Sequence, residues 1–200
     1  MTGGLGSARG EVDSGLMSHR IHLAVALERA GWHPAAWRAA GLSPSTLTTP
    51  RHWADQVRVL DRAGVAFATI EDALSLTDRI EDPNDPDPRR LHGRIDAVLL
   101  ASALAPLTHR IGLIPTVTTT HTEPFHVATG IQTLDFASRG RAGVRLVVGG
   151  SAAERANFGR RDEIDLETGF REAGEVADAL GRLWDSWQDD AIIRDAASGR

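Results

Sequence analysis

The feature that most constrains the fold of this chain is a repeated alternation of a short apolar strand and an amphipathic helix. Apolar residues recur at three- and four-residue steps in each expected helix. Because the strands are apolar on both faces, they are expected to form a parallel sheet with helical cover. The expected strands occupy residues 21–28, 65–72, 111–118 and 142–150. The expected helices occupy residues 50–63, 94–105, 124–137 and 170–187.

Signals at the helix ends support this alternation. Thr49 is a credible N-cap, and Pro50 then stands at the first helical position. Gly64 closes that helix, and Gly140 lies just past the end of a later one.

Two parallel architectures fit, an open doubly wound sheet and a (β/α)₈ TIM barrel. An open dinucleotide-binding sheet usually carries G-x-G-x-x-G after its first strand, and the segment ERAGWHPAAWR at residues 28–38 lacks it. The barrel is therefore favoured, although a barrel typically has about 250 residues and eight strands. We predict an α/β fold of the (β/α)₈ TIM-barrel type, truncated to about the first four βα units with parallel strands. Residues 1–18 are expected to form a disordered tail, and residues 19–200 the N-terminal half of the barrel domain.

Composition excludes several classes of function. Of the 200 residues, 42% are hydrophobic and 24% charged, and the net charge of -5 does not favour nucleic-acid or anionic-membrane binding. The chain has no cysteine and all 22 basic residues are arginine, which excludes disulfides, thiolate chemistry and Schiff-base lysine chemistry. It shows no metal-binding spacing such as H-E-x-x-H and no apolar run of membrane-spanning length. These features predict a cytoplasmic protein without a metal.

Polar residues gather where the expected strands end, which is where parallel α/β folds bind ligands. The third strand runs into a cluster of hydroxyls in IGLIPTVTTTHTEPFHVA, residues 111–128. Thr116 and Thr118 are two residues apart and therefore point to the same side of the strand. Their hydroxyls suit a ligand edge that alternates carbonyl and ring nitrogen, although threonine is also simply a good strand former. Asp72 ends the second strand beside Glu71, either as a ligand-binding residue or as a helix N-cap or salt-bridge partner.

Histidines are candidate proton-transfer groups. His33 lies in the loop after the first strand, beside Trp32 and Trp37, and that loop would cover the mouth of a barrel. His22 lies opposite the aliphatic face of the first strand, as either an interior catalytic residue or a hydrogen-bonded core residue. We take His33 and His22 as the candidate catalytic residues. Weaker candidates are His121, His126, Arg160 and Arg161.

These residues resemble a known family. Residues 111–128, followed by LDFASRGRAGVRLVV, are similar to the luciferase-like flavin-dependent monooxygenases, and most closely to their nitrilotriacetate/alkane monooxygenase-type branch. Other segments that carry the resemblance are HLAVALERAGWHPAAWR, VAFATIEDAL, RIDAVLLASALAPLTHRIGL, ANFGRR and LWDSW. The resemblance runs from about residue 19 to the C-terminus. It implies a (β/α)₈ barrel and oxygenation of a small organic substrate by O2 with reduced FMN, which a separate flavin reductase supplies.

The resemblance also implies site residues and marks departures from the family pattern. The implied cofactor-binding residues are Asp72, Thr116 and Thr118. The branch often has a His and a Tyr one helical turn apart before the last long helix, where this chain has Leu166 and Phe170. Many relatives have an Asn where Arg145 stands, and Arg145 would either alter the electrostatics near the flavin or face the helix layer. Relatives continue well past the length of this chain, so the second half of the barrel is expected to be missing.

The residues leave three hypotheses open. The first is a flavin-dependent monooxygenase that uses reduced FMN. The second is a non-catalytic half-barrel that binds flavin weakly or pairs with another chain, including a homo-oligomer through exposed sheet edges. The third is an oxidoreductase that uses the deazaflavin F420. None of them involves a nucleic acid or a membrane as partner, and the flavin that copurifies would separate them.

Overall fold

The computed structural model describes residues 21–75, 93–188, 191 and 193–199, so the tail expected at residues 1–18 lies outside the described residues. The strands are β1 (Ala24–Leu27), β2 (Phe67–Ile70), β3 (Gly112–Thr118) and β4 (Arg145–Val147). The helices are α1 (Ala36–Ala39), α2 (Pro44–Leu47), α3 (Pro50–Ala63), α4 (Ala97–Leu104), α5 (Pro124–Ser138), α6 (Ala152–Phe158) and α7 (Leu166–Trp184), with a 3₁₀ turn at Ala105–Leu107. In this part of the chain no helix is both long and apolar enough to cross a membrane.

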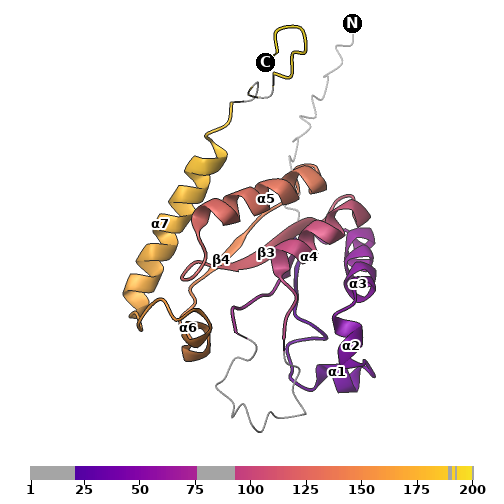
Figure 1. Ribbon diagram of the computed structural model, residues 1–200. Coiled ribbons are helices and arrows are strands. Elements are labelled where there is room, and N and C mark those ends of the chain that lie inside the picture. The colour runs from indigo at the N-terminus through magenta and orange to yellow at the C-terminus, as the bar shows by residue number, and fades with distance from the viewer. Residues whose placement is uncertain (1–20, 76–92, 189–190, 192, 200) are drawn as a thin grey trace, which may run out of the picture.

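The strands form one parallel sheet in the order β1-β2-β3-β4 (Figure 1). Ala24 of β1 stands beside Phe67 of β2, which stands beside Gly112 of β3. Thr116 of β3 stands beside Arg145 of β4. This order and direction confirm the prediction of adjacent parallel strands contributed by successive βα units.

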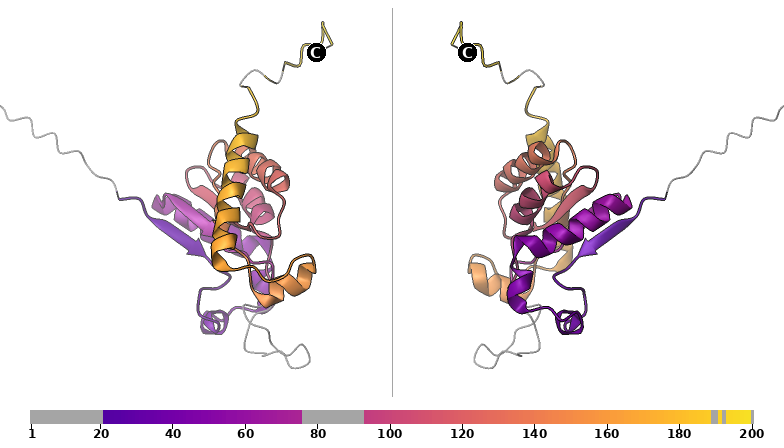
Figure 2. Two further views of the ribbon diagram at one scale, coloured as in Figure 1. Left: turned by 90° about the vertical axis from the view of Figure 1, so that its left-hand side faces the viewer. Right: turned by 90° about the vertical axis from the view of Figure 1, so that its right-hand side faces the viewer.

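The sheet has one covered face and one open face. Helices α3, α4, α5 and α7 lie against the covered face (Figure 2). Side chains alternate along each strand, so every second residue points into this helix layer. The strand residues buried there include Leu27, Ala68, Ile70, Leu113 and Val117. The open face carries Ala24, Ala26, Ile114, Thr116, Thr118 and Arg145. In a closed barrel such a face would be the interior.

The ends of α3 follow the signals in the sequence. The helix begins at Pro50 and ends before Gly64, whose φ of 76° is left-handed, as predicted. Thr49 occupies the N-cap position with extended backbone, but its side chain does not cap the helix. Its hydroxyl donates instead to the carbonyl of Thr46 at 2.6 Å.

Several elements differ in extent from the expectation. β2 and β4 are shorter than the expected ranges 65–72 and 142–150, and α4 is shorter than the expected range 94–105. β1 begins at Ala24 and not at residue 21, and the side chain of Ile21 is exposed. α7 begins at Leu166, four residues earlier than expected, because Asp165 caps it, and it ends before Trp187, which is exposed. The short helices α1, α2 and α6 were not expected from the sequence.

The start of β3 is fixed by Asp61 of α3. Its carboxylate accepts hydrogen bonds from the backbone N–H groups of His109, Arg110 and Ile111 at 3.1, 2.8 and 2.8 Å. Burial by itself raises the pKa of Asp61. The three N–H donors and the charge of Arg110 together lower it by more than burial raises it, so the pKa lies below its usual value. The strand is therefore anchored to α3 before it reaches its carboxyl end.

Candidate functional site

The carboxyl ends of the strands lie at one end of the sheet, and the loops with α1 and α6 follow them there (Figure 1). Thr116 and Thr118 end β3 on the open face and are only 2% and 4% exposed. Gly149 after β4 lies so close to Thr118 that an added Cβ would come within 2.4 Å of Thr118 Cγ2. The two threonines therefore lie on one side of the strand, as their spacing predicts, and the end of β4 encloses them.

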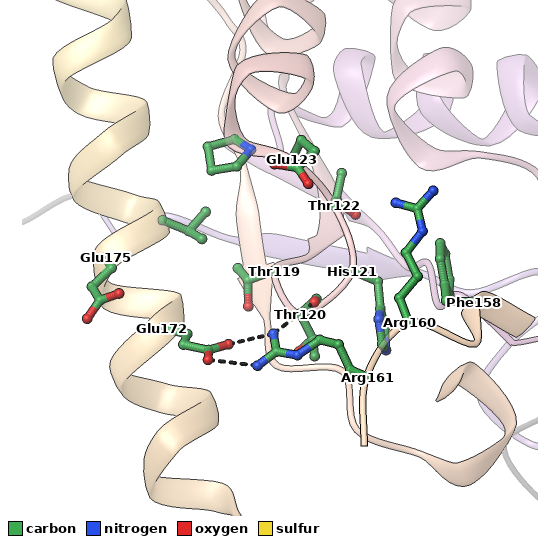
Figure 3. Close-up of a pocket in the computed structure, with 12 residues that line it drawn as sticks. Thr119, Thr120, His121, Thr122, Glu123, Phe158, Arg160, Arg161, Glu172 and Glu175 are labelled. Atoms are coloured by element: carbon green, nitrogen blue, oxygen red, sulfur yellow. Dashed lines mark hydrogen bonds and ion pairs between the residues drawn. The ribbon is translucent and has the colours of Figure 1, made fainter. Parts of the chain in front are cut away.

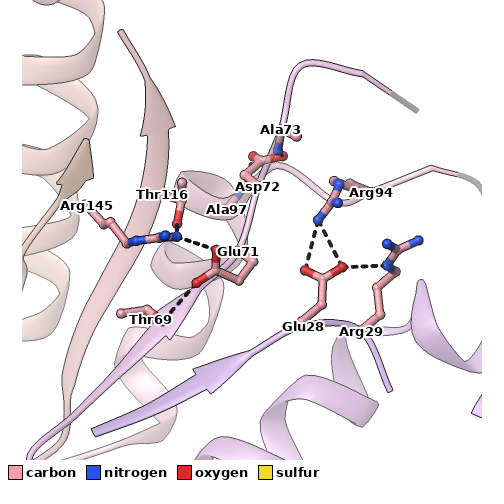
Figure 4. Close-up of polar contacts among 10 residues, drawn as sticks. All are labelled: Glu28, Arg29, Thr69, Glu71, Asp72, Ala73, Arg94, Ala97, Thr116 and Arg145. Carbon is pink, nitrogen blue, oxygen red and sulfur yellow. Dashed lines mark hydrogen bonds and ion pairs between the residues drawn. The ribbon is translucent and has the colours of Figure 1, made fainter. Parts of the chain in front are cut away.

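Arg145 lies on the open face beside Thr116 (Figure 4). Its Nη1 donates to the carboxylate of Glu71 at the end of β2 and to Thr116 Oγ1 at 3.3 Å. Glu71 also accepts a hydrogen bond from Thr69 Oγ1 at 3.1 Å. Of the two placements considered for Arg145, the structure shows the open face and not the helix layer. The ion pair with Glu71 joins β2 to β4 across β3, and the sequence analysis missed it.

Asp72 points to the other side, toward the start of α4 (Figure 4). One carboxylate oxygen accepts from the N–H of Ala97, the first residue of α4, at 2.9 Å, and the other accepts from Ala73 at 2.7 Å. Burial raises the pKa of Asp72, and these two donors offset part of the rise. Of the roles considered for Asp72, these contacts match a structural one at a helix N-terminus. The carboxylate accepts a backbone N–H at the start of α4, the positive end of the helix dipole.

A second cluster of charged side chains lies at the end of β1 (Figure 4). The buried carboxylate of Glu28 accepts from Arg94 at 3.1 and 2.9 Å and from Arg29 at 2.8 Å. The sequence analysis did not single out Glu28. The available signal was its position, because Glu28 follows the first strand as Glu71 follows the second.

The candidate catalytic histidines lie away from Thr116 and Thr118. His33 is exposed in the loop before α1, near the carboxyl ends of the strands, and its Nδ1 accepts a hydrogen bond from the N–H of Ala35 at 3.1 Å. His22 is exposed and precedes β1, so it lies at the opposite end of the sheet from Thr118. The structure brings neither imidazole into contact with the two threonines.

Asp72, Thr116 and Thr118 all contribute to a pocket of about 340 Å³ at the end of β3. Residues of α4 and α5, including Val98 and Val127, form its other walls, so it opens on the helix side of the sheet. Alternation along β3 places the threonine side chains on the open face. The three residues are therefore neighbours, but they do not all point into one cavity.

A further pocket, of about 490 Å³, lies between the β3–α5 loop, α6 and α7 (Figure 3). His121 stacks on Phe158 there with ring centroids 4.7 Å apart, and its buried Nε2 has no hydrogen-bond partner in the described part of the chain. Burial lowers the pKa of His121, which favours the neutral ring. Arg161 makes two 2.8 Å hydrogen bonds to Glu172 of α7. The charge of Arg161 is therefore already paired with that of Glu172.

Helix α6 ties together the ends of β2 and β4. The buried carboxylate of Glu154 accepts from the N–H groups of Leu74, Gly150 and Ser151 at 3.2, 2.9 and 3.2 Å. Asn157 Nδ2 donates to the carbonyl of Leu74 at 2.9 Å, so α6 binds both backbone polar groups of Leu74. The signal in the sequence was a capping box, with Ser at the N-cap and Glu three residues later, and it was not used.

The remaining departures from the family pattern are two apolar residues on α7. Leu166 and Phe170 are exposed on α7, where the resemblance places polar flavin contacts. Within the described ranges no group of three or more His, Cys, Asp or Glu side chains is arranged to hold a metal ion.

Parallel βα units, a helix-covered face and polar side chains at the carboxyl ends of the strands define a protein of the α/β-barrel class, with its ligand end at those strand termini. A family model described as luciferase-like monooxygenase matches residues 21–194. The chain therefore belongs to the luciferase-like monooxygenase family, which confirms the resemblance drawn from its sequence.

Known proteins support this assignment and the fold. Nitrilotriacetate monooxygenase component A of Aminobacter aminovorans is 31% identical over 189 residues, which cover 90% of this chain and 41% of the relative. The structure of EDTA monooxygenase from Chelativorans sp. BNC1 matches with a TM-score of 0.77 at 23% identity, over 88% of this chain and 40% of that one. Riboflavin lyase, solved with modified FMN and riboflavin, matches with a TM-score of 0.76 at 26% identity, over 90% and 42%. The prediction of a barrel-type α/β fold is confirmed, and the chain spans about two fifths of the length of the proteins it matches.

Proposed function

We propose that this protein is the oxygenating component of a flavin-dependent monooxygenase that uses reduced FMN and O2 on a small organic substrate. The observation that carries the proposal is the position of Thr116 and Thr118, whose side chains end a buried strand on the open face, at the ligand end of the fold. A relative whose name contains "component A" supports a separate flavin reductase as the partner.

The donors at this end fit one edge of a flavin ring. Thr116 Oγ1 accepts a hydrogen bond from Arg145, which leaves its own O–H free to donate. Thr118 adds a second hydroxyl on the same side, and the guanidinium adds a positive charge beside them. Hydroxyls and a cation suit the alternating carbonyl and ring-nitrogen edge of the isoalloxazine. Bound FMN supplies the chemistry with dioxygen, and the protein supplies binding, orientation and electrostatics.

The loop that carries His33 lies at the same end of the sheet and is proposed to close over the ring and exclude water. His33 Nδ1 accepts the N–H of Ala35, so the neutral imidazole carries its proton on Nε2, and Nε2 is the atom that would donate a hydrogen bond. Asp72 is proposed to act by holding the start of α4 and, with it, the end of β2. A catalytic role for His22 stays a prediction, because its position at the far end of the sheet offers no support.

A non-catalytic role is the second candidate, and the open face favours it. β1 and β4 are the edges of the described sheet, so each has backbone groups that a further strand could pair with. In this case the chain binds flavin weakly or pairs with another chain, including a second copy of itself.

The flavin that the chain retains separates these candidates. The 200-residue chain should be purified, its released cofactor identified as FMN or F420 by absorption, and its affinity for each measured by titration. We expect FMN to bind and, with a flavin reductase, oxygen consumption to rise when nitrilotriacetate is added as the first probe. FMN binding without oxygen consumption, together with a native mass above the monomer, would favour the non-catalytic candidate. A chain that binds neither flavin would contradict the proposal.

A further inference from the structure

Arg145 is anchored on the open face but remains accessible. Its side chain is 44% exposed, whereas that of its partner Glu71 is 11% exposed. The contacts to Glu71 and to Thr116 both use one terminal nitrogen, Nη1. Within residues 21–75 and 93–188, no hydrogen bond joins Nη2 or Nε of Arg145 to another residue. The guanidinium is therefore fixed by one nitrogen and presents its other donors to the open face.

The strand register places this cation beside the proposed ligand edge. Arg145 stands next to Thr116, and Val147, two residues later, stands next to Thr118. Thr116 Oγ1 already contacts Nη1 at 3.3 Å. Any acceptor atom held by the Thr116 hydroxyl therefore lies next to the guanidinium. The charge of Arg145 acts on whatever charge the ligand carries at that edge.

Reduction changes the charge of a flavin. Two electrons and one proton convert the neutral oxidised isoalloxazine into an anion whose charge lies along N1 and the C2 carbonyl. A fixed cation stabilises that anion more than it stabilises the neutral ring. We propose that Arg145, held in place by Glu71, makes this site bind reduced FMN in preference to oxidised FMN. The inference rests on the proposed function, because it takes a flavin as the ligand.

Glu71 provides an internal check on this inference. It orients the guanidinium, but its own negative charge opposes the binding of an anion. Removing the charge of Arg145 should therefore weaken the preference for reduced FMN, and removing the charge of Glu71 should strengthen it. A pair with only a structural role would behave differently, because loss of either partner would affect both flavin forms in the same direction.

The experiment measures the dissociation constants of oxidised FMN and of FMN reduced anaerobically with dithionite. The proteins compared are the unaltered chain and its Arg145→Gln, Arg145→Lys, Glu71→Gln and Arg171→Gln variants. Arg171 is a matched control, because it is an exposed arginine on α7 whose ion pair with Glu175, at 2.9 Å, lies away from the open face. Arg145→Gln is expected to reduce the preference for reduced FMN by about tenfold. That factor corresponds to a fall of about 30 mV in the two-electron potential of the bound flavin.

The other variants fix the interpretation. Arg145→Lys should keep most of the preference, Glu71→Gln should increase it, and Arg171→Gln should leave it unchanged. If the chain binds FMN and Arg145→Gln has an unchanged preference, the inference is wrong and the proposed function stands. The inference is also wrong if Glu71→Gln and Arg145→Gln shift the preference in the same direction, and Glu71→Gln alone decides the matter if Arg145→Gln does not fold. If the unaltered chain binds neither form of FMN, both the inference and the proposed function fail.

Discussion

Replacement of Asp61 by asparagine is expected to destabilise the protein by about 3 kcal/mol, because this carboxylate anchors the start of β3. Oδ1 accepts from the N–H groups of Arg110 and Ile111, and Oδ2 accepts from that of His109. Asparagine can retain the first two contacts through its carbonyl oxygen, but its NH₂ group would then face the N–H of His109. The variant therefore loses one hydrogen bond to a charged acceptor, worth about 1.5–3 kcal/mol, and weakens two others.

The same change has a pH signature. The pKa of Asp61 is lower in the folded protein than its ordinary value of 3.8, so the unfolded chain takes up the proton more readily. The stabilisation by this carboxylate is fully present above that ordinary value and is lost as the pH falls through the lower, folded pKa. The difference in unfolding free energy between the unaltered chain and Asp61→Asn should therefore shrink in acid.

Urea unfolding followed by circular dichroism, at neutral pH and below pH 3.8, measures both effects. Asp55→Asn is the matched control, because Asp55 lies on the same helix with a 66% exposed carboxylate 3.7 Å from Arg58. Its effect should stay within about 0.5 kcal/mol. Equal midpoints for the two variants at neutral pH would refute the reasoning. They would mean that the N–H groups of residues 109–111 find other acceptors without cost.

Three further perturbations test the ligand end. Thr118→Val should weaken FMN binding by about 1 kcal/mol, the net value of one hydrogen bond, in a fluorescence titration. Thr133→Val on the outer helix α5 is its control, and equal affinities in both variants would argue against a direct contact. Glu154→Ala should loosen α6 and accelerate amide exchange at Leu74, Gly150 and Ser151 by about tenfold or more. Glu163→Ala, which removes an exposed carboxylate 3.5 Å from Arg155, should leave those amides protected; equal exchange in the two variants would count against the role of Glu154. Asp72→Asn should lower stability by about 1 kcal/mol through the start of α4 and reduce FMN affinity less than Thr118→Val does. A larger loss of affinity than stability would instead assign Asp72 to the flavin.

Much of the fold could be predicted because it depends on local sequence. The alternation of strand and helix fixed the number, order and direction of the strands, since parallel neighbours need a helical crossover between them. Pro50 and Gly64 marked the ends of α3 because each has backbone geometry that suits only those positions. The start of α7 was misplaced because the apolar pattern was followed from Phe170, while Asp165 marks the cap.

The candidate site was less predictable, because its contacts join residues far apart in the sequence. The two-residue spacing of Thr116 and Thr118 was enough to place them on one side of β3. The contact of Arg145 with Glu71 depends on the register of β2, β3 and β4 together, and no local pattern reports that register. The same holds for Glu154, whose carboxylate reaches the peptide of Leu74, 80 residues away in the chain.

The two neighbouring carboxylates at the end of β2 show why position along the chain is not enough to assign a role. Successive residues of a strand point to opposite faces, so Glu71 reaches the open face while Asp72 reaches the helix side. The first N–H groups of α4 have no partner within their own helix, and Asp72 accepts one of them, that of Ala97. Turning Asp72 toward the open face would break that bond and the one to Ala73, and would carry Glu71 away from Arg145. Of these two carboxylates, Glu71 is therefore the one placed to reach the open face, and the need of α4 for an acceptor decides between the two.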